Sequence, residues 1–273
     1  MTLTIAFSNL AWDPANDRKV AAILRDTGIR GIELAPTKIW PELSAATRRE
    51  ATAYRRFWER EGFTITSLQS LLYGRPELTV FGGPEDRAAL VAHLDTVMAL
   101  AATLGAAKLV FGSPANRRRG DLSPSMAMTR AAAVFGELSE RAEAHGVCLC
   151  LEPNPTDYGC DFITNATEGA ELVREVGRDG FGLHLDTGAM TLAGDELSTA
   201  IRAVADVLAH FHCSEPGLAP AGTTGRVDHI SAARALRSIS YAGVVSVEML
   251  PARDRDPLTA VAEAAAFAVE TYG

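Results

Sequence analysis

The feature that most constrains this fold is a pattern that recurs along the whole chain. A short apolar or β-branched run is followed by a longer stretch with apolar residues three and four positions apart. Runs of the first kind are typical of buried strands, and the longer stretches are typical of amphipathic helices. The predicted strands are eight in number and cover residues 4–8, 31–35, 64–69, 108–113, 147–152, 182–187, 209–214 and 244–248.

The alternation of strand and helix predicts an α/β fold with a parallel sheet, because parallel neighbours are joined by helical crossovers. Eight such units favour closure into a (β/α)8 TIM barrel, and the 273 residues are close to the ~250 typical of that fold. An open, doubly wound sheet is the alternative, but no glycine-rich phosphate turn follows the first strand. We therefore predict a single barrel domain over residues 1–273.

Charge and composition narrow the class of partner. The formal net charge is -8, and such a surface repels phosphate backbones, so nucleic acid is not an expected partner. The most apolar long stretch, near residues 88–111, contains His93, Asp95 and Lys108, so no membrane span is predicted. The N-terminus lacks a signal-peptide pattern, and the four cysteines form no C-x-x-C motif. We expect a cytoplasmic chain with reduced thiols.

Metal-ligand residue types end the last four predicted strands. They are Glu152, Asp186, His212 and Glu248. In a (β/α)8 barrel the carboxyl ends of the strands form one mouth, which holds the active site. Three carboxylates gathered there require a cation, and no Arg or Lys lies on these strand ends to form an ion-pair network instead. The sequence therefore predicts one divalent metal ion per chain. The oxygen-rich set makes Mn²⁺ the first expectation, with Mg²⁺, Co²⁺ and Zn²⁺ as alternatives.

These strand ends occur in the sequences LEP at 151–153, HLDTG at 184–188, HFH at 210–212 and VE at 247–248. In this order and spacing they resemble the xylose-isomerase-like barrel superfamily, and its ketose 3-epimerases and hydroxypyruvate isomerases above all. GIELAP at 31–36 and RVD at 226–228 extend the resemblance over nearly the whole chain. It implies that the same four residues bind the metal. It also implies that Glu152 and Glu248 flank the substrate as the catalytic acid/base pair.

One position departs from the pattern of these relatives. Many of them have a histidine three residues after the sixth-strand aspartate, where it helps to hold substrate or metal, and this chain has Ala189 there. His184 and His210 each lie two residues before a predicted ligand and so face the same side of their strands. They are candidates to compensate, and a role as buried, hydrogen-bonded histidines deeper in the barrel is the alternative.

Further residues near the strand ends are candidates for substrate binding. Asn116 and Arg117 follow the fourth strand, where a guanidinium can contact a phosphate or carboxylate. A solvated basic loop is the alternative for Arg117. Glu215 is a candidate to contact substrate or to pair with Arg226. The full set of predicted substrate-binding residues is Glu33, Gln69, Asn116, Arg117, His184 and Glu215.

The predicted function is a metal-dependent epimerase or isomerase of a small carbohydrate. A metal polarises the substrate carbonyl as a Lewis acid, and carboxylates on two faces then move the neighbouring proton. A lyase resembling inosose dehydratases is the alternative on the same site. Endonuclease relatives require more histidines for a multi-metal cluster than the six present, and a non-catalytic binding protein on this scaffold remains open. The sequence leaves the oligomeric state open and allows a homodimer.

Overall fold

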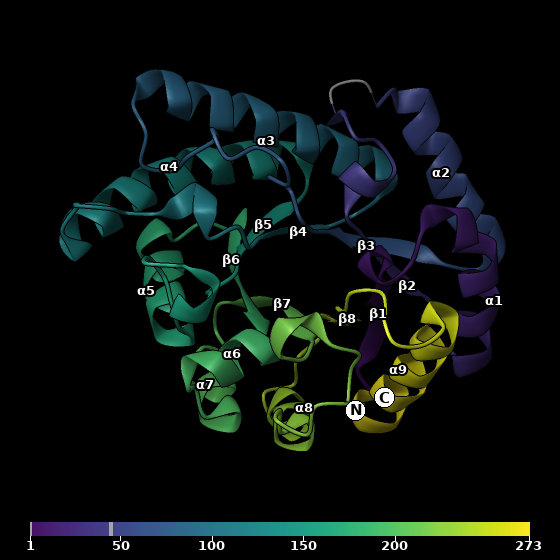
Figure 1. The fold of residues 1–273 in the computed structure, drawn as a ribbon. Coiled ribbons are helices and arrows are strands. Elements are labelled where there is room, and N and C mark those ends of the chain that lie inside the picture. The colour runs from purple at the N-terminus through teal and green to yellow at the C-terminus, as the bar shows by residue number, and fades with distance from the viewer. Residues whose placement is uncertain (1, 44–45) are drawn as a thin grey trace.

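A computed structural model describes residues 2–43 and 46–273 of the chain. Eight parallel strands follow one another around a closed barrel, in chain order, and β1 pairs with β8 to close it (Figure 1). This confirms the predicted TIM barrel. The strands are β1 (Thr4–Ser8), β2 (Gly31–Leu34), β3 (Thr64–Leu68), β4 (Lys108–Phe111), β5 (Cys148–Leu151), β6 (Phe181–Asp186), β7 (Leu208–Cys213) and β8 (Val244–Val247).

Helices surround the barrel and shield it from solvent (Figure 1). The sequence determines many of their ends. Thr47 caps the N-terminus of one helix in a capping box with Glu50, and Gly62 ends it with a φ of 90° that a side chain would disfavour. The helices are α1 (Asp17–Thr27), α2 (Arg48–Glu61), α3 (Pro84–Leu104), α4 (Pro124–His145), α5 (Ala166–Val176), α6 (Thr187–Ala193), α7 (Leu197–Ala203), α8 (His229–Ser238) and α9 (Pro257–Tyr272).

The connection between β6 and β7 differs from one long helix. It consists of two short helices, α6 and α7. Asp186, the last residue of β6, begins α6 directly, because its Oδ1 accepts a hydrogen bond of 2.6 Å from the amide of Ala189. The first helical turn is therefore fixed to the strand end, and Asp186 is held at the barrel mouth.

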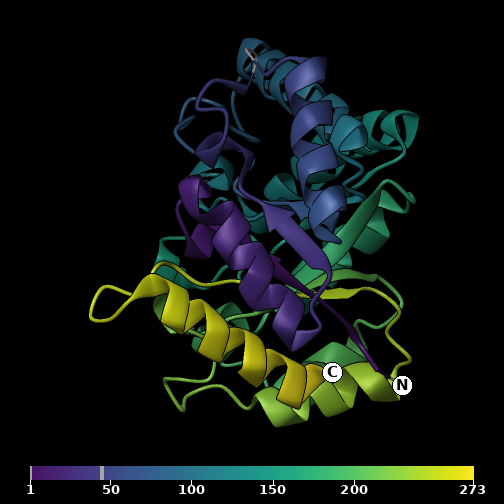
Figure 2. The ribbon, with the colours of Figure 1, turned by 90° about the vertical axis from the view of Figure 1, so that its right-hand side faces the viewer.

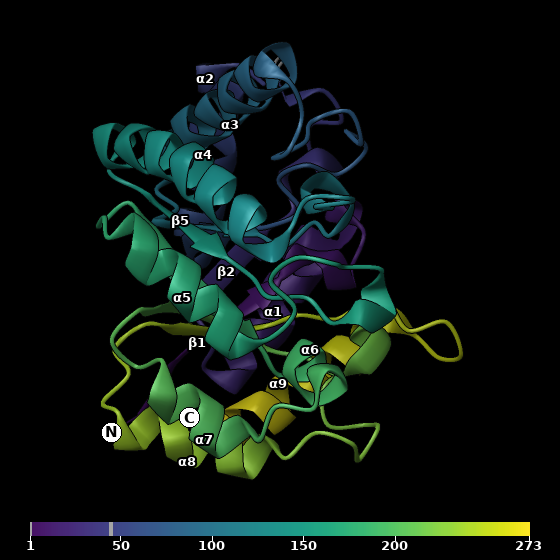
Figure 3. The same ribbon diagram turned by 90° about the vertical axis from the view of Figure 1, so that its left-hand side faces the viewer.

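Helix α3 is long and apolar enough to cross a membrane by length and composition alone. In the structure it lies beside α2 and α4, and Leu90, Leu94 and Val97 on one of its faces are buried (Figure 3). Buried core helices of other proteins pass the same test. The burial of this face explains the apolar composition of α3 without a bilayer.

The two ends of the chain lie close together and complete the ring of helices. Figure 2 shows α9, in yellow, alongside α1, in purple, and the two helices are in contact. Within α9, Ala260, Val261 and Ala264 are buried where this last helix covers β8 and β1. The barrel is thus closed both by its sheet and by its outer layer.

Candidate functional site

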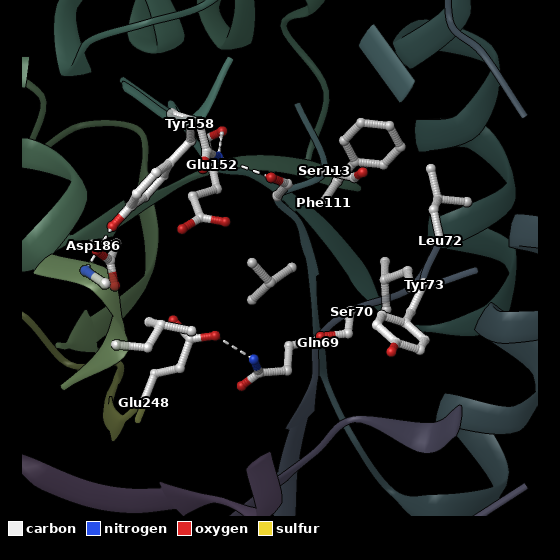
Figure 4. Close-up of a pocket in the computed structure, with 16 residues that line it drawn as sticks. Gln69, Ser70, Leu72, Tyr73, Phe111, Ser113, Glu152, Tyr158, Asp186 and Glu248 are labelled. Carbon is white, nitrogen blue, oxygen red and sulfur yellow. Dashed lines mark hydrogen bonds between the residues drawn. The ribbon is translucent and has the colours of Figure 1, made fainter. Parts of the chain in front are cut away.

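The four predicted metal ligands gather at the carboxyl-terminal mouth of the barrel. Asp186 ends β6 and pairs in register with His212 on β7. Glu152 and Glu248 follow β5 and β8 directly, and their amides donate to carbonyls of the neighbouring strands. Three of these residues, Glu152, Asp186 and Glu248, line the same pocket (Figure 4). Four successive strands thus bring distant positions of the sequence together.

Short distances connect these side chains. His212 Nδ1 lies 3.2 Å from Glu248 Oε2 and 3.8 Å from Asp186 Oδ2. One ligand atom from each of Glu152, Asp186, His212 and His184 lies within 4.8 Å of all the others. Glu248 is held from the other side by the amide of Gln69, which donates to Oε1 (Figure 4). Gln69 lines the pocket, as expected of a substrate-binding residue, and its amide nitrogen is already paired with Glu248.

Negative charge is concentrated in the mouth. Burial, together with the charges of Asp186 and Glu248, raises the pKa of Glu152 well above its usual value. Burial and the charge of Glu248 raise the pKa of Asp186 to about 6. Carboxylates that repel one another in a desolvated pocket are stabilised as anions by a cation placed between them.

Unsatisfied polar atoms give an independent test of whether a metal fits. Within the described chain, Asp186 Oδ2 is buried and has no hydrogen-bond partner, and buried His212 Nδ1 makes no well-aligned hydrogen bond although it lies 3.2 Å from Glu248 Oε2. Such groups are rare because they cost about 1–3 kcal/mol each. Both atoms are metal-ligand types, and they lie beside Glu152 and Glu248. The carboxylate and imidazole donors present here therefore fit a divalent cation.

Glu33 lies beneath this cluster and has a different role from the one expected. Its side chain is fully buried, and its carboxylate lies 2.9 Å from His212 Nε2 and 3.1 Å from His210 Nε2. Burial alone would raise the pKa of Glu33, but His212 and His210 hold it well below its usual range. Glu33 thus fixes the proton of His212 on Nε2 and leaves Nδ1 facing the cluster. This arrangement corrects the expectation that Glu33 contacts substrate.

The structure places His184 and His210 inside the barrel, below the mouth. His184 packs edge-on against His212, with the ring centroids 4.1 Å apart. His210 hydrogen-bonds Glu33, as the buried alternative predicts. His184 does not line the pocket, so the expectation that it contacts substrate there is corrected.

Two residues after β4 point into the protein wall instead of the pocket. Arg117 is fully buried, and its guanidinium donates to the carbonyls of Glu152 at 2.6 Å, Phe162 at 3.2 Å and Phe111 at 3.4 Å. Asn116 donates to carbonyls of the preceding loop at 2.6 and 2.7 Å. These contacts correct the expectation of an anion-binding rim, because Arg117 is already used to hold the backbone around Glu152 and Asn116 to hold the loop after β3.

Glu215 is also placed away from the pocket. It is buried and accepts hydrogen bonds from the amide of Gly222 and the hydroxyl of Thr224, and it lies 3.3 Å from His229 Nε2. His229 therefore replaces Arg226 as its basic partner. Glu215 organises the loop before α8, and the expectation that it contacts substrate is corrected.

Several pocket residues were not found from the sequence. The pocket has a volume of about 420 Å³, and its wall opposite the acids includes Leu72, Tyr73 and Phe111 (Figure 4), while Leu71 also lines the pocket. Tyr158 lies on the acidic side. The leucines follow Gln69 on the loop after β3, a position that could have indicated them, but apolar residues in a loop are more often core. The sequence alone does not distinguish a leucine that lines the pocket from one that packs in the core.

Comparison with known families agrees with this architecture. A family model described as the xylose isomerase-like TIM barrel matches residues 21–270. The chain belongs to this family. The match extends from α1 to α9, so the xylose isomerase-like barrel accounts for nearly the whole protein, as the resemblance in the sequence implied.

Among curated relatives, the chain is similar to two named epimerases. It is 32% identical over 111 residues to the D-psicose 3-epimerase of Agrobacterium fabrum (strain C58), which is 41% of this chain and 38% of the relative. It is 30% identical over 120 residues to the L-ribulose 3-epimerase of Mesorhizobium japonicum, which is 44% of this chain and 40% of the relative. The chain thus matches well under half the length of each relative.

Solved structures share the complete fold. A crystal structure of a D-psicose 3-epimerase in the presence of D-fructose superposes with a TM-score of 0.82 and 19% identity, over 100% of both chains. A structure of an L-ribulose 3-epimerase gives a TM-score of 0.81 and 22% identity over 100% of this chain and 95% of the other. At such identities the similarity establishes the barrel fold.

Proposed function

We propose that this xylose isomerase-like barrel is a divalent-metal-dependent epimerase or isomerase that acts on a small, uncharged sugar. The observation that carries the proposal is the cluster of Glu152, Asp186, His212 and Glu248 at the barrel mouth, with two buried ligand-type atoms that lack partners among the described residues. The similarity to named ketose 3-epimerases supports the choice of reaction. Mn²⁺ is our first choice of ion, and the cytoplasmic location and the homodimer remain predictions.

Glu152 and Glu248 are the proposed acid/base pair. They reach into the pocket from different sides of its acidic half (Figure 4). A metal bound here would polarise a substrate carbonyl as a Lewis acid. One glutamate then takes the proton from the adjacent carbon, and the other returns a proton from the opposite face. Gln69 orients Glu248 for this work through its hydrogen bond to Oε1.

The pocket lining supports an uncharged substrate. Of the described residues around it, none is lysine or arginine, while three are acidic. A phosphate would face repulsion there with no cationic side chain to offset it. The wall of Leu71, Leu72 and Phe111 instead suits the less polar face of a sugar. The first candidate substrates are ketoses such as D-psicose and L-ribulose, which appear in the names of this chain's relatives.

Solvent isotope exchange tests the reaction. Metal-loaded protein would be incubated with candidate ketoses in deuterated water, and we expect substrate and product to gain deuterium on the carbon beside the carbonyl. Products of unchanged formula apart from the label support an epimerase or isomerase, whereas loss of water would indicate the lyase. Turnover without incorporation of label would contradict the exchange of a proton through Glu152 and Glu248.

Glutamine variants sharpen this test. Glu152→Gln and Glu248→Gln each keep the shape of the side chain and remove a proton acceptor. We expect one of the variants to retain metal and to exchange the substrate proton on the face of the remaining glutamate, without completing epimerisation. Asp186→Ala should instead lower the ion content below one per chain, since it removes a proposed ligand and no proton carrier. Equal ion content in Asp186→Ala and wild type would contradict the metal assignment.

A further inference from the structure

His184 is a buried side chain whose chemistry is not yet accounted for. It lies on β6, two residues before Asp186, and its exposed fraction is 0%. Within the described chain, neither Nδ1 nor Nε2 has a hydrogen-bond partner. The other two histidines of the barrel interior differ in this respect, because His210 and His212 both contact the carboxylate of Glu33.

The immediate surroundings of His184 offer aromatic rings where a hydrogen-bond acceptor would be expected. Its ring centroid is 4.1 Å from that of His212 and 5.2 Å from that of His210. A neutral imidazole carries one donor and one acceptor, and burying both without partners costs roughly 2–6 kcal/mol. An apolar residue of similar size would avoid that cost, so the imidazole at this position requires a ligand as its explanation.

The geometry also indicates where that ligand lies. A nitrogen of His184 is within 4.8 Å of ligand atoms from Glu152, Asp186 and His212, and these three are likewise within 4.8 Å of one another. Asp186 Oδ2 and His212 Nδ1 are themselves buried without partners in the described part of the chain. Three side chains from two adjacent strands thus present unpaired ligand atoms in one small volume.

We propose that His184 is an additional protein ligand of the metal, on the side of the ion that faces the barrel interior. This inference rests on the metal site of the proposed function and deepens it. Glu248 does not belong to the group of described residues whose ligand atoms all lie within 4.8 Å, and Gln69 holds it toward the pocket. His184 therefore supplies a firm inner ligand, and Glu248 is left better placed to exchange a proton with substrate.

Pulsed electron paramagnetic resonance of the Mn²⁺-loaded protein tests this assignment, because the electron spin echo is modulated by each directly bound imidazole nitrogen. We expect two such nitrogens in the wild-type protein, from His212 and His184. A count of one would overturn the role of His184 and leave the metal site intact. Failure of the wild-type protein to bind Mn²⁺, Co²⁺ or Zn²⁺ would overturn the metal site and this inference together.

A matched pair of variants assigns the second nitrogen. His184→Asn and His210→Asn make the same change at two buried positions, and only the first removes a proposed ligand. We expect the count to fall to one in His184→Asn, with Mn²⁺ affinity about 10-fold to 100-fold weaker, at least as large as the loss of an outer partner. The count should stay at two in His210→Asn. If His184→Asn does not fold, two nitrogens in both the wild type and His210→Asn still support His184, whereas one nitrogen in His210→Asn, or unchanged counts in both variants, would overturn it.

Discussion

The two halves of the barrel mouth are built in opposite ways. The half formed by β5 to β8 carries Glu152, Asp186, His212 and Glu248, and most of these side chains are fixed by contacts within the protein. The other half, after β3 and β4, is uncharged and largely apolar, and Tyr73 on its rim is 75% exposed (Figure 4). Contacts within the protein hold the charged half, whereas the other half presents an exposed ring, so the groups proposed to perform chemistry are separate from those that shape the pocket.

The charged half is also costly to the fold in a way the apolar half is not. Glu152 and Asp186 have raised pKa values because burial and the repulsion of neighbouring carboxylates oppose their ionisation. Groups in this state are typical of functional sites, where stability is given up for reactivity. The comparison therefore predicts that substitutions on the charged side alter turnover and metal binding, whereas those on the apolar side alter substrate affinity.

The largest effect is expected from Glu152→Gln and Glu248→Gln. Each removes one proton carrier, and general acid–base groups contribute about 100-fold to 10,000-fold to rate. We therefore expect turnover of a confirmed sugar substrate to fall about 1,000-fold in each variant, measured as kcat, with a melting temperature no lower than that of the wild type. Glu171→Gln, at an exposed position on α5, is the control. Near-normal kcat in both site variants would contradict the assignment of catalysis to the charged half.

Glu33→Gln tests whether support from beneath the mouth matters. The amide has one accepting oxygen in place of two and carries no charge, so it holds the Nε2 protons of His210 and His212 less firmly, and the orientation of His212 is less well fixed. Loss of such outer partners weakens metal affinity by about 10-fold to 100-fold, which titration calorimetry would measure. Glu215→Gln alters another buried glutamate beside a histidine, but one outside the cluster. If both variants bind metal as the wild type does, Glu33 only fills space.

The pH dependence of the charged half follows from Asp186. Without an ion, its pKa is about 6 in the fold against 3.8 for an ordinary aspartate. Between these values the folded chain binds more protons than the unfolded chain, so this group lowers the free energy of unfolding as pH rises from 3.8 to about 6. A metal must displace that proton, so its affinity falls below pH 6.

Thermal denaturation with and without metal measures this linkage. The rise in melting temperature on adding Mn²⁺ should be larger at pH 7 than at pH 5, because binding to the native state stabilises it by mass action. In Asp186→Asn, which cannot ionise, the remaining rise should depend less on pH. A metal-induced rise that grows as pH falls would reverse the predicted sign.

The smallest effect is expected on the apolar side. Tyr73→Ala removes a ring that is mostly exposed until substrate covers it, which corresponds to about 1 kcal/mol or about a fivefold rise in KM. Because the ring lies across the pocket from the acids (Figure 4), kcat should stay unchanged. Tyr73→Phe keeps the ring and should behave as the wild type. A fall in kcat with constant KM would place Tyr73 with the catalytic half.

Much of this architecture could be predicted from the sequence, for a physical reason. Strand and helix periods differ, so eight alternating units identify the barrel. In a closed parallel barrel all strands end at one mouth, so the residues at the ends of β5 to β8 had to meet there. The gathering of Glu152, Asp186, His212 and Glu248 was therefore available before any coordinates.

The sequence did not predict how deep in the barrel each side chain lies or in which direction each loop residue points. The alternation along a strand tells which side chains point inward, but the stagger between strands decides which inward residues meet. Glu33 was expected at the pocket and instead lies beneath His212. Arg117 follows its strand on the correct side, yet a turn directs it onto the carbonyls of Glu152 and Phe162. Contacts of this kind depend on loop conformation, which local sequence specifies weakly.

Gly112, the residue after β4, is constrained by its neighbour on the next strand. A Cβ atom there would lie 1.8 Å from Glu152 Oε2. Its φ is not in the left-handed region, so the glycine provides space and not backbone freedom. In evolutionary terms, the residue types at positions 112 and 152 are expected to change together. Descendants of this barrel that abandon the glutamate become free to acquire a side chain at position 112, whereas those that retain it must move the Glu152 carboxylate to make room.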